Sequence, residues 1–127
     1  MKVLVIEDHE QELRLVMHVL VDAGNNVGGV ASAEQAIEAI RRDRPDLLLV
    51  DITLPGIDGF QLARSLRADP ETRELAMVAV TTYPEEYPRH DALLAGFDGY
   101  LVKPISTRTL PDELKQIVAQ RNGDSIQ

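Results

Sequence analysis

Short apolar runs alternate along this chain with segments in which apolar residues recur every three or four positions. Residues 3–6 form the first apolar run, which is typical of a buried strand. The apolar positions of the next segment have helical spacing: Leu13, Val16, Met17 and Leu20. Gly24 is a natural stop for that helix. The pattern therefore predicts a strand followed by an amphipathic helix.

The same alternation predicts further strands and helices to the end of the chain. Apolar runs follow at residues 27–31, 46–50, 77–80 and 100–102. Ser32 and Gln35 form a capping-box pattern that opens the second helix. Asp58 can cap the third helix, after a loop with turn signals at Pro55-Gly56 and Asp58-Gly59. Pro84 and Pro88 lie where the fourth helix would begin, so it is expected to start late.

Repeated strand and helix units of this kind predict an α/β fold. Right-handed crossovers give a parallel sheet with helices on both faces, and its ligands bind beyond the carboxyl ends of the strands. Three consecutive leucines at 47–49 indicate a central strand that is covered on both faces. The length of 127 residues suits one domain, which we expect over residues 1–121 with a short tail at 122–127.

Charge and composition narrow the classes of partner. The formal charge of −8 disfavours nucleic acid, since DNA binding depends on basic groups, and it leaves proteins, cations and small phosphate donors. The chain has no cysteine, which excludes disulfides and thiolate zinc sites. Neither a signal peptide nor a membrane-spanning segment is apparent, so a cytoplasmic location without membrane binding is expected.

Five polar side chains lie at the ends of four predicted strands: Glu7, Asp8, Asp51, Thr81 and Lys103. Carboxylates gathered at one sheet edge repel one another unless a cation lies among them, and oxygen ligands of this type suit Mg²⁺. Lys103 could hold a phosphoryl oxygen, and Thr81 could donate a hydrogen bond to it. Taken singly, each residue is better explained as a surface group, a helix cap or a strand former. Together they favour metal-dependent phosphoryl transfer.

Several ordered motifs carry a resemblance to a known family. They are Val-Leu-Val-Ile-Glu-Asp at 3–8, Asp-Ile-Thr-Leu-Pro-Gly-Ile-Asp-Gly at 51–59, Thr81, and Gly-Tyr-Leu-Val-Lys-Pro at 99–104. The chain resembles the receiver (CheY-like) domain of two-component response regulators over about residues 2–120. This resemblance implies a three-layer, flavodoxin-like (βα)5 fold with a parallel five-stranded sheet of order 2-1-3-4-5.

The resemblance also implies roles for individual residues. Asp51 would be the phosphoacceptor and would help to bind Mg²⁺ or Mn²⁺. Asp8 would bind the metal directly, Glu7 through water, and Thr53 through its backbone carbonyl. The phosphoryl group would be contacted by Lys103 and Thr81. Tyr100, which could otherwise be an ordinary half-buried strand aromatic, would turn together with Thr81 as a switch.

By the same resemblance, the chain would be a signalling switch of a two-component system or phosphorelay. It would accept the phosphoryl group from a histidine kinase or a histidine phosphotransfer protein and act on a downstream protein, and the resemblance allows a homodimer. It would be no enzyme beyond its own phosphorylation and dephosphorylation. Thr82 stands where the family often has a smaller residue and is expected to slow attack on the phosphoryl group. His9, His18 and His90 are expected at the surface, without metal-ligand spacing.

Two other functions compete with this interpretation. A Mg²⁺-dependent phosphotransferase or phosphatase with an aspartyl-phosphate usually has a second acid two residues after the nucleophile, where this chain has Thr53. A flavin-binding module of the same fold class needs a first loop that accepts phosphate. In this chain, Glu7 and Asp8 would repel the phosphate group of a flavin. A colourless purified protein would exclude bound flavin.

Overall fold

The computed structural model describes residues 1–53 and 58–123. The expected turn at Pro55-Gly56 and the end of the predicted tail, residues 124–127, lie outside these ranges. The strands are β1 (Lys2–Ile6), β2 (Asn26–Val30), β3 (Leu47–Asp51), β4 (Ala76–Thr81) and β5 (Gly99–Val102). The helices are α1 (Glu10–Asp22), α2 (Ala33–Arg42), α3 (Gly59–Ala68), α4 (Arg89–Ala95) and α5 (Leu110–Arg121).

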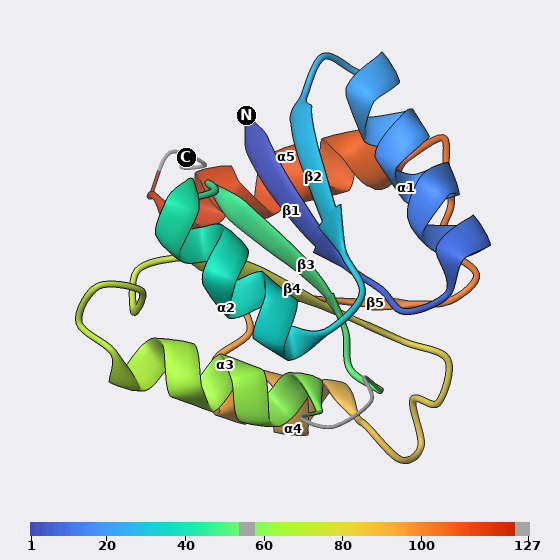
Figure 1. Ribbon diagram of the computed structural model, residues 1–127. Coiled ribbons are helices and arrows are strands. Elements are labelled where there is room, and N and C mark those ends of the chain that lie inside the picture. Colours follow the sequence, from blue (N-terminus) through green and yellow to red (C-terminus); the bar gives the residue numbers. More distant parts are fainter. Residues whose placement is uncertain (54–57, 124–127) are drawn as a thin grey trace.

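All strand pairs are parallel, and the sheet has the order β2-β1-β3-β4-β5. Figure 1 shows α1 and α5 on one face of the sheet and α2, α3 and α4 on the other. The predicted three-layer fold and strand order are therefore confirmed. α5 ends at Arg121, while the division of the chain into a domain over 1–121 and a tail stays a prediction.

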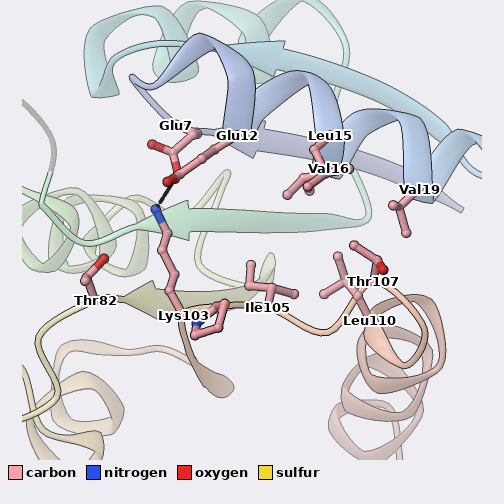
Figure 2. Close-up of a pocket in the computed structure, with 11 residues that line it drawn as sticks. Glu7, Glu12, Leu15, Val16, Val19, Thr82, Lys103, Ile105, Thr107 and Leu110 are labelled. Carbon is pink, nitrogen blue, oxygen red and sulfur yellow. Dashed lines mark hydrogen bonds and ion pairs between the residues drawn. The ribbon is translucent and has the colours of Figure 1, made fainter.

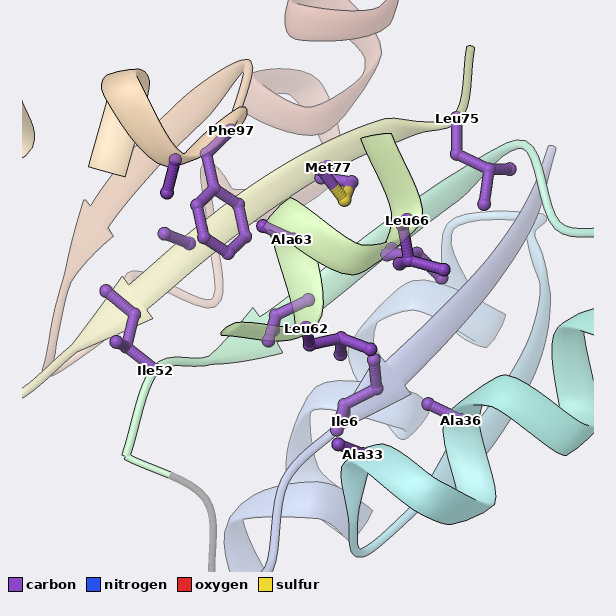
Figure 3. Close-up of a cluster of buried hydrophobic side chains, with 14 of the residues drawn as sticks. Ile6, Ala33, Ala36, Ile52, Leu62, Ala63, Leu66, Leu75, Met77 and Phe97 are labelled. Carbon is purple, nitrogen blue, oxygen red and sulfur yellow. The ribbon is translucent and has the colours of Figure 1, made fainter. Parts of the chain in front are cut away.

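Alternation of side chains along each buried strand produces two apolar clusters, one on each face of the sheet. Leu48 and Val50 of β3 point into the cluster beneath α2, α3 and α4, part of which is shown in Figure 3. Leu47 and Leu49 point into the cluster beneath α1 and α5. β3 is buried along its whole length, as expected for a central strand. Its last residue is Asp51, so the candidate phosphoacceptor belongs to the sheet itself.

Side-chain caps fix the starts of α2 and α3. Asp58 and Gln61 form a reciprocal capping box at the start of α3, so the predicted cap is confirmed. Ser32 accepts a hydrogen bond from the Gln35 backbone, but the Gln35 side chain accepts from Ala31 and not from Ser32. The predicted capping box of α2 is therefore only half formed, because the side chain reaches one residue further back.

The fourth helix begins late, as the two prolines predict. Pro88 is its N-cap, so α4 starts at Arg89 and spans only seven residues. Gly96 ends it with a left-handed backbone at φ 116°, a conformation that glycine adopts without the steric cost of a Cβ. The segment between β4 and α4 is consequently long, and it lies next to the carboxyl ends of the central strands.

A network of ionic hydrogen bonds closes the opposite end of the sheet. Arg67 of α3 donates to the backbone oxygens of Arg73, Leu75 and Gly96 and to Asp98, with distances of 2.6 to 3.0 Å. Asp98 also accepts from Arg121 of α5 at 2.8 Å. Burial lowers the pKa of Arg67, although Asp98 opposes this effect. The network joins helices from both faces of the sheet.

Replacement of Arg67 by methionine is expected to lower the free energy of unfolding by about 3 kcal/mol, because several partly buried acceptors would lose a charged donor. Urea denaturation followed by circular dichroism measures the change. Arg41→Met, at an exposed position of α2, is the control and should change stability by less than about 0.5 kcal/mol. Equal stability of the two variants would contradict a stabilising role for the network.

Candidate functional site

The ends of three strands bring acidic and basic side chains from distant parts of the chain together. Glu7 directly follows β1, Asp51 ends β3, and Lys103 directly follows β5. The Lys103 ammonium nitrogen lies 2.8 Å from Glu7 Oε1 and 3.1 Å from Asp51 Oδ2. These contacts span 96 and 52 positions of the sequence. The parallel sheet thus gathers the predicted residues at one edge.

The Asp51 carboxylate is held at both of its oxygens. Oδ1 accepts hydrogen bonds from the backbone N–H and the hydroxyl of Thr53, each at 3.0 Å, and Oδ2 faces Lys103. Asp51 is only 5% exposed. Its backbone is fixed by pairing with Val80 of β4. The side chain therefore lies in a defined orientation at the mouth of the site.

A close backbone approach anchors the far end of the segment that follows Asp51. The Gly59 N–H donates to the Ile52 carbonyl oxygen at 2.7 Å. A Cβ atom at position 59 would lie 2.7 Å from the Ile52 Cα, where the backbone could not give way without a shift. Glycine at this position therefore allows α3 to start directly against the end of β3.

The acids at this edge provide a fit for a divalent cation. Glu7, Asp8, His9 and Asp51 each offer a ligand atom, and these atoms all lie within 4.8 Å of one another. Carboxylate oxygens are the ligands that Mg²⁺ prefers, and it keeps several waters when bound to one or two carboxylates. The acidic cluster could therefore hold Mg²⁺, and the residue types agree with the predicted cofactor.

His9 takes part in this cluster although its sequence spacing gave no indication of it. Its side chain is 70% exposed, as predicted for a surface histidine, yet Nδ1 lies 3.3 Å from Glu7 Oε2. The hydrogen bond to Glu7 and the charge of Asp8 raise the pKa of His9. The backbone N–H of His9 also donates to the same Glu7 oxygen at 3.1 Å. His9 thus helps to orient Glu7.

The pKa values of both Glu7 and Lys103 are raised, although for different reasons. Burial raises the pKa of Glu7 to about 7, although hydrogen bonds from Lys103 and His9 oppose this shift. Burial by itself would lower the pKa of Lys103, but hydrogen bonds to Glu12 and Glu7 and the charge of Asp51 raise it above its ordinary value. Lys103 is therefore a permanent cation among the acids.

Thr81 is the last residue of β4 and is completely buried. Its hydroxyl oxygen accepts a hydrogen bond from the Tyr83 backbone at 2.9 Å. Within residues 1–53 and 58–123, no hydrogen bond links Thr81 to Asp51. The hydroxyl stays at the sheet edge, engaged with the segment that leads to α4. Its neighbour Thr82 is exposed and faces the surface beside Lys103.

Tyr100 of β5 is half-buried and packs against the cluster beneath α2, α3 and α4. Its hydroxyl donates a 2.5 Å hydrogen bond to the backbone oxygen of Tyr87. The Tyr87 ring in turn makes an edge-to-face contact with Phe60 of α3, with ring centroids 5.7 Å apart. Tyr100 therefore ties β5 to the segment between Thr81 and α4. Burial raises the pKa of the Tyr100 hydroxyl.

The sequence interpretation missed a further acid at the site. Glu12, in the first turn of α1, places Oε2 2.5 Å from the Lys103 ammonium nitrogen. Figure 2 shows Glu7 and Glu12 reaching toward Lys103 from neighbouring segments. Glu12 is an ordinary polar position of an amphipathic helix and follows no strand directly. Only its spacing of five residues from Glu7 could have drawn attention to it.

A groove of about 400 Å³ begins at these charged groups and runs between α1 and the segment that joins β5 to α5 (Figure 2). Leu15, Val16 and Val19 of α1 line one side, and Ile105 and Leu110 line the other. Lys103 and Pro104, which are joined by a cis peptide bond, lie at the charged end. The groove is mainly apolar away from this end.

No helix within the described ranges is both long enough and apolar enough to cross a membrane.

Comparison with known proteins identifies relatives of the whole fold. The family model for the response regulator receiver domain matches residues 3–115. The chain is 36% identical over 125 residues to the phosphate regulon transcriptional regulatory protein PhoB of Rhizobium meliloti. This alignment covers 98% of the chain but 55% of PhoB, so the chain spans about half the length of that relative.

In two further comparisons, the alignment covers nearly all of this chain and nearly all of the relative. The chain is 30% identical over 118 residues to the chemotaxis protein CheY-3 of Vibrio cholerae, with 92% of the chain and 91% of CheY-3 aligned. The crystal structure of a sensor protein from Polaromonas is 31% identical and has a TM-score of 0.86, with coverage of 94% and 97%. The sequence match, the strand order and the structural similarity agree, and the chain belongs to the response regulator receiver domain family of two-component signalling.

Proposed function

We propose that the chain is a phosphorylation-dependent switch whose phosphoacceptor is Asp51. The observation that supports this most directly is the position of the Asp51 carboxylate, which contacts the Lys103 ammonium group and lies within 4.8 Å of ligand atoms of Glu7 and Asp8. A lysine supplies positive charge where a phosphoryl oxygen would lie, and a cation held by the acids would supply it on the other side. Phosphoryl transfer depends mainly on such positioning and charge stabilisation.

In the proposed reaction, an Asp51 oxygen forms a bond to phosphorus while the bond from phosphorus to the donor nitrogen or oxygen breaks. Asp8 and Asp51 would bind Mg²⁺ or Mn²⁺ directly, Glu7 would act through water, and the Thr53 carbonyl would be a further ligand. When bound by these residues, the metal would supply positive charge to the transferring group. Lys103 would exchange one of its present carboxylate hydrogen bonds for one to a phosphoryl oxygen. The Thr53 hydroxyl donates a hydrogen bond to Asp51. This contact does not suit the acid/base catalyst that the competing function, a phosphatase or phosphotransferase, would need at position 53.

Thr81 and Tyr100 are proposed to carry the phosphorylation state to the surface. If the Thr81 hydroxyl moved toward Asp51 to donate to a phosphoryl oxygen, the hydrogen bond that it accepts from Tyr83 would be stretched, because the whole hydroxyl would move. The segment between β4 and α4, which contains Tyr83, also carries the Tyr87 carbonyl that accepts a hydrogen bond from the Tyr100 hydroxyl. A movement of Thr81 would thus alter the hydrogen bond of Tyr100, because both residues contact the loop between β4 and α4.

The proposed partners follow from the receiver family. A histidine kinase or a histidine phosphotransfer protein would supply the phosphoryl group, in keeping with the match to a sensor protein structure. A downstream protein, or a second copy of this chain, would read the phosphorylated surface. The cytoplasm is the proposed location. Direct binding to nucleic acid is not proposed for this domain, because its formal charge is −8.

The test uses acetyl phosphate as a small phosphoryl donor and intact mass spectrometry as the readout. The wild type is expected to gain one phosphoryl group when Mg²⁺ is present and none when EDTA removes the metal, because the acids would then repel the donor. Mn²⁺ should restore the uptake. Equal uptake with and without the metal would contradict the proposed role of the acidic cluster.

A further inference from the structure

Lys103 is bound by a carboxylate that lies outside the proposed metal-binding set. An ammonium group has three hydrogens to donate, and three carboxylate oxygens lie around Nζ. The distances are 2.8 Å to Glu7, 3.1 Å to Asp51 and 2.5 Å to Glu12, so the Glu12 contact is the shortest. All donors of Lys103 are therefore engaged before any phosphoryl group arrives.

Glu12 and Lys103 come from different elements and differ in their exposure to solvent. It lies in the first turn of α1, and its side chain is 48% exposed, whereas the Lys103 side chain is 14% exposed. The hydrogen bond from Lys103 lowers the pKa of Glu12. The contact thus joins an ionised surface acid to the innermost cation of the site, across 91 positions of the sequence.

We propose that Glu12 is a positioning residue that restrains Lys103 in the unphosphorylated protein and competes with the phosphoryl group for it. This inference rests on the proposed function, since it concerns the same phosphoryl transfer to Asp51. Lys103 can bind a phosphoryl oxygen only by giving up one of its present acceptors. The charge of Glu12 holds the ammonium group toward α1, and it also repels an anionic donor that approaches the same edge.

The rate test compares two variants that remove the same charge from the same helical turn. Glu12→Gln removes the charged partner of Lys103, whereas Glu10→Gln removes an exposed acid that pairs with Arg14 instead. With acetyl phosphate and Mg²⁺, the second-order rate constant of phosphorylation is expected to rise about threefold to tenfold in Glu12→Gln. It should change less than about twofold in Glu10→Gln, because exposed ion pairs contribute little.

A spectroscopic test reports on the contact without any phosphoryl transfer. The chain has three lysines, Lys2, Lys103 and Lys115, so ¹⁵N-lysine labelling gives few ammonium signals to assign. The Lys103 ammonium signal is expected to move in Glu12→Gln and to stay in place in Glu10→Gln. Lys103→Met identifies the signal by its loss. An unmoved Lys103 signal in Glu12→Gln would overturn the restraint.

The two readouts separate failure of this inference from failure of the proposed function. If the wild type takes up phosphate but Glu12→Gln is equally fast or slower, competition by Glu12 is overturned and Asp51 remains the proposed acceptor. If both acid variants speed the reaction equally, general charge and not the Lys103 contact is responsible. If the wild type takes up no phosphate at all, the proposed function fails, and the competition inferred here fails with it.

Discussion

Replacement of Asp51 by asparagine is expected to abolish phosphoryl uptake from acetyl phosphate. The amide that replaces the carboxylate keeps the size of the side chain and one oxygen for the Thr53 hydrogen bonds, but it lacks the anionic oxygen that would attack phosphorus. Uptake should fall from one phosphoryl group per chain to none, as measured by intact mass spectrometry in the presence of Mg²⁺.

The control for this experiment is Asp22→Asn. Asp22 is an exposed acid at the end of α1, so its replacement changes the net charge by the same amount away from the site. This variant should be phosphorylated like the wild type. Equal labelling of Asp51→Asn and the wild type would show that another residue accepts the phosphoryl group, and the assignment of Asp51 would then be wrong.

Replacement of Lys103 by methionine is expected to lower the free energy of unfolding by about 3 kcal/mol in metal-free solution near neutral pH. The Lys103 ammonium group directly contacts both buried carboxylates, Glu7 and Asp51. Methionine retains much of the apolar stem but leaves these charges facing one another. Urea denaturation gives the stability. Mg²⁺ should restore part of the loss by binding the folded state.

The pH dependence gives this prediction a second check. Because burial raises the pKa of Glu7 from 4.5 to about 7, the folded protein binds this proton more tightly than the unfolded chain does. The resulting stability is fully present below about pH 4.5 and is lost as the pH rises through about 7. The deficit of Lys103→Met should therefore be smaller at about pH 5.5 than at about pH 7.5.

Lys115→Met serves as the matched control, since Lys115 is an exposed lysine of α5. Its stability should follow that of the wild type at both pH values. A Lys103→Met deficit that is unchanged between these conditions would argue against electrostatic repulsion as its cause. It would instead indicate a loss of packing by the lysine stem.

Strand and helix types could be predicted from the sequence because each element carries a clear local pattern. The leucines at 47–49 marked a central buried strand, and Pro88 marked the late start of α4. The strand boundaries differ from the predicted apolar runs, since β3 extends through Asp51 and β4 through Thr81. A polar residue at a strand end interrupts the apolar run in the sequence, although its backbone is still paired with the neighbouring strand.

The core of the candidate site was also accessible from the sequence, because Glu7, Asp51 and Lys103 all stand at strand ends. The contacts of Glu12 and His9 were not, since they depend on how the start of α1 is oriented toward the sheet. The same holds for Arg67 and its acceptors at the opposite edge. Some of these contacts are distant in sequence, such as that of Glu12 with Lys103, and others are close, such as that of His9 with Glu7, but no local periodicity marks any of them.

Asp51 combines two properties: its side chain faces the candidate site, while its backbone is paired within the central sheet. It pairs with Val80, and the next residue donates from its N–H to the Val80 oxygen at 3.0 Å. Central sheet positions are among the last parts of a domain to open. A phosphoryl group attached here would therefore leave the backbone of β3 in place. The conformational change is expected away from the sheet, in the long segment that precedes α4.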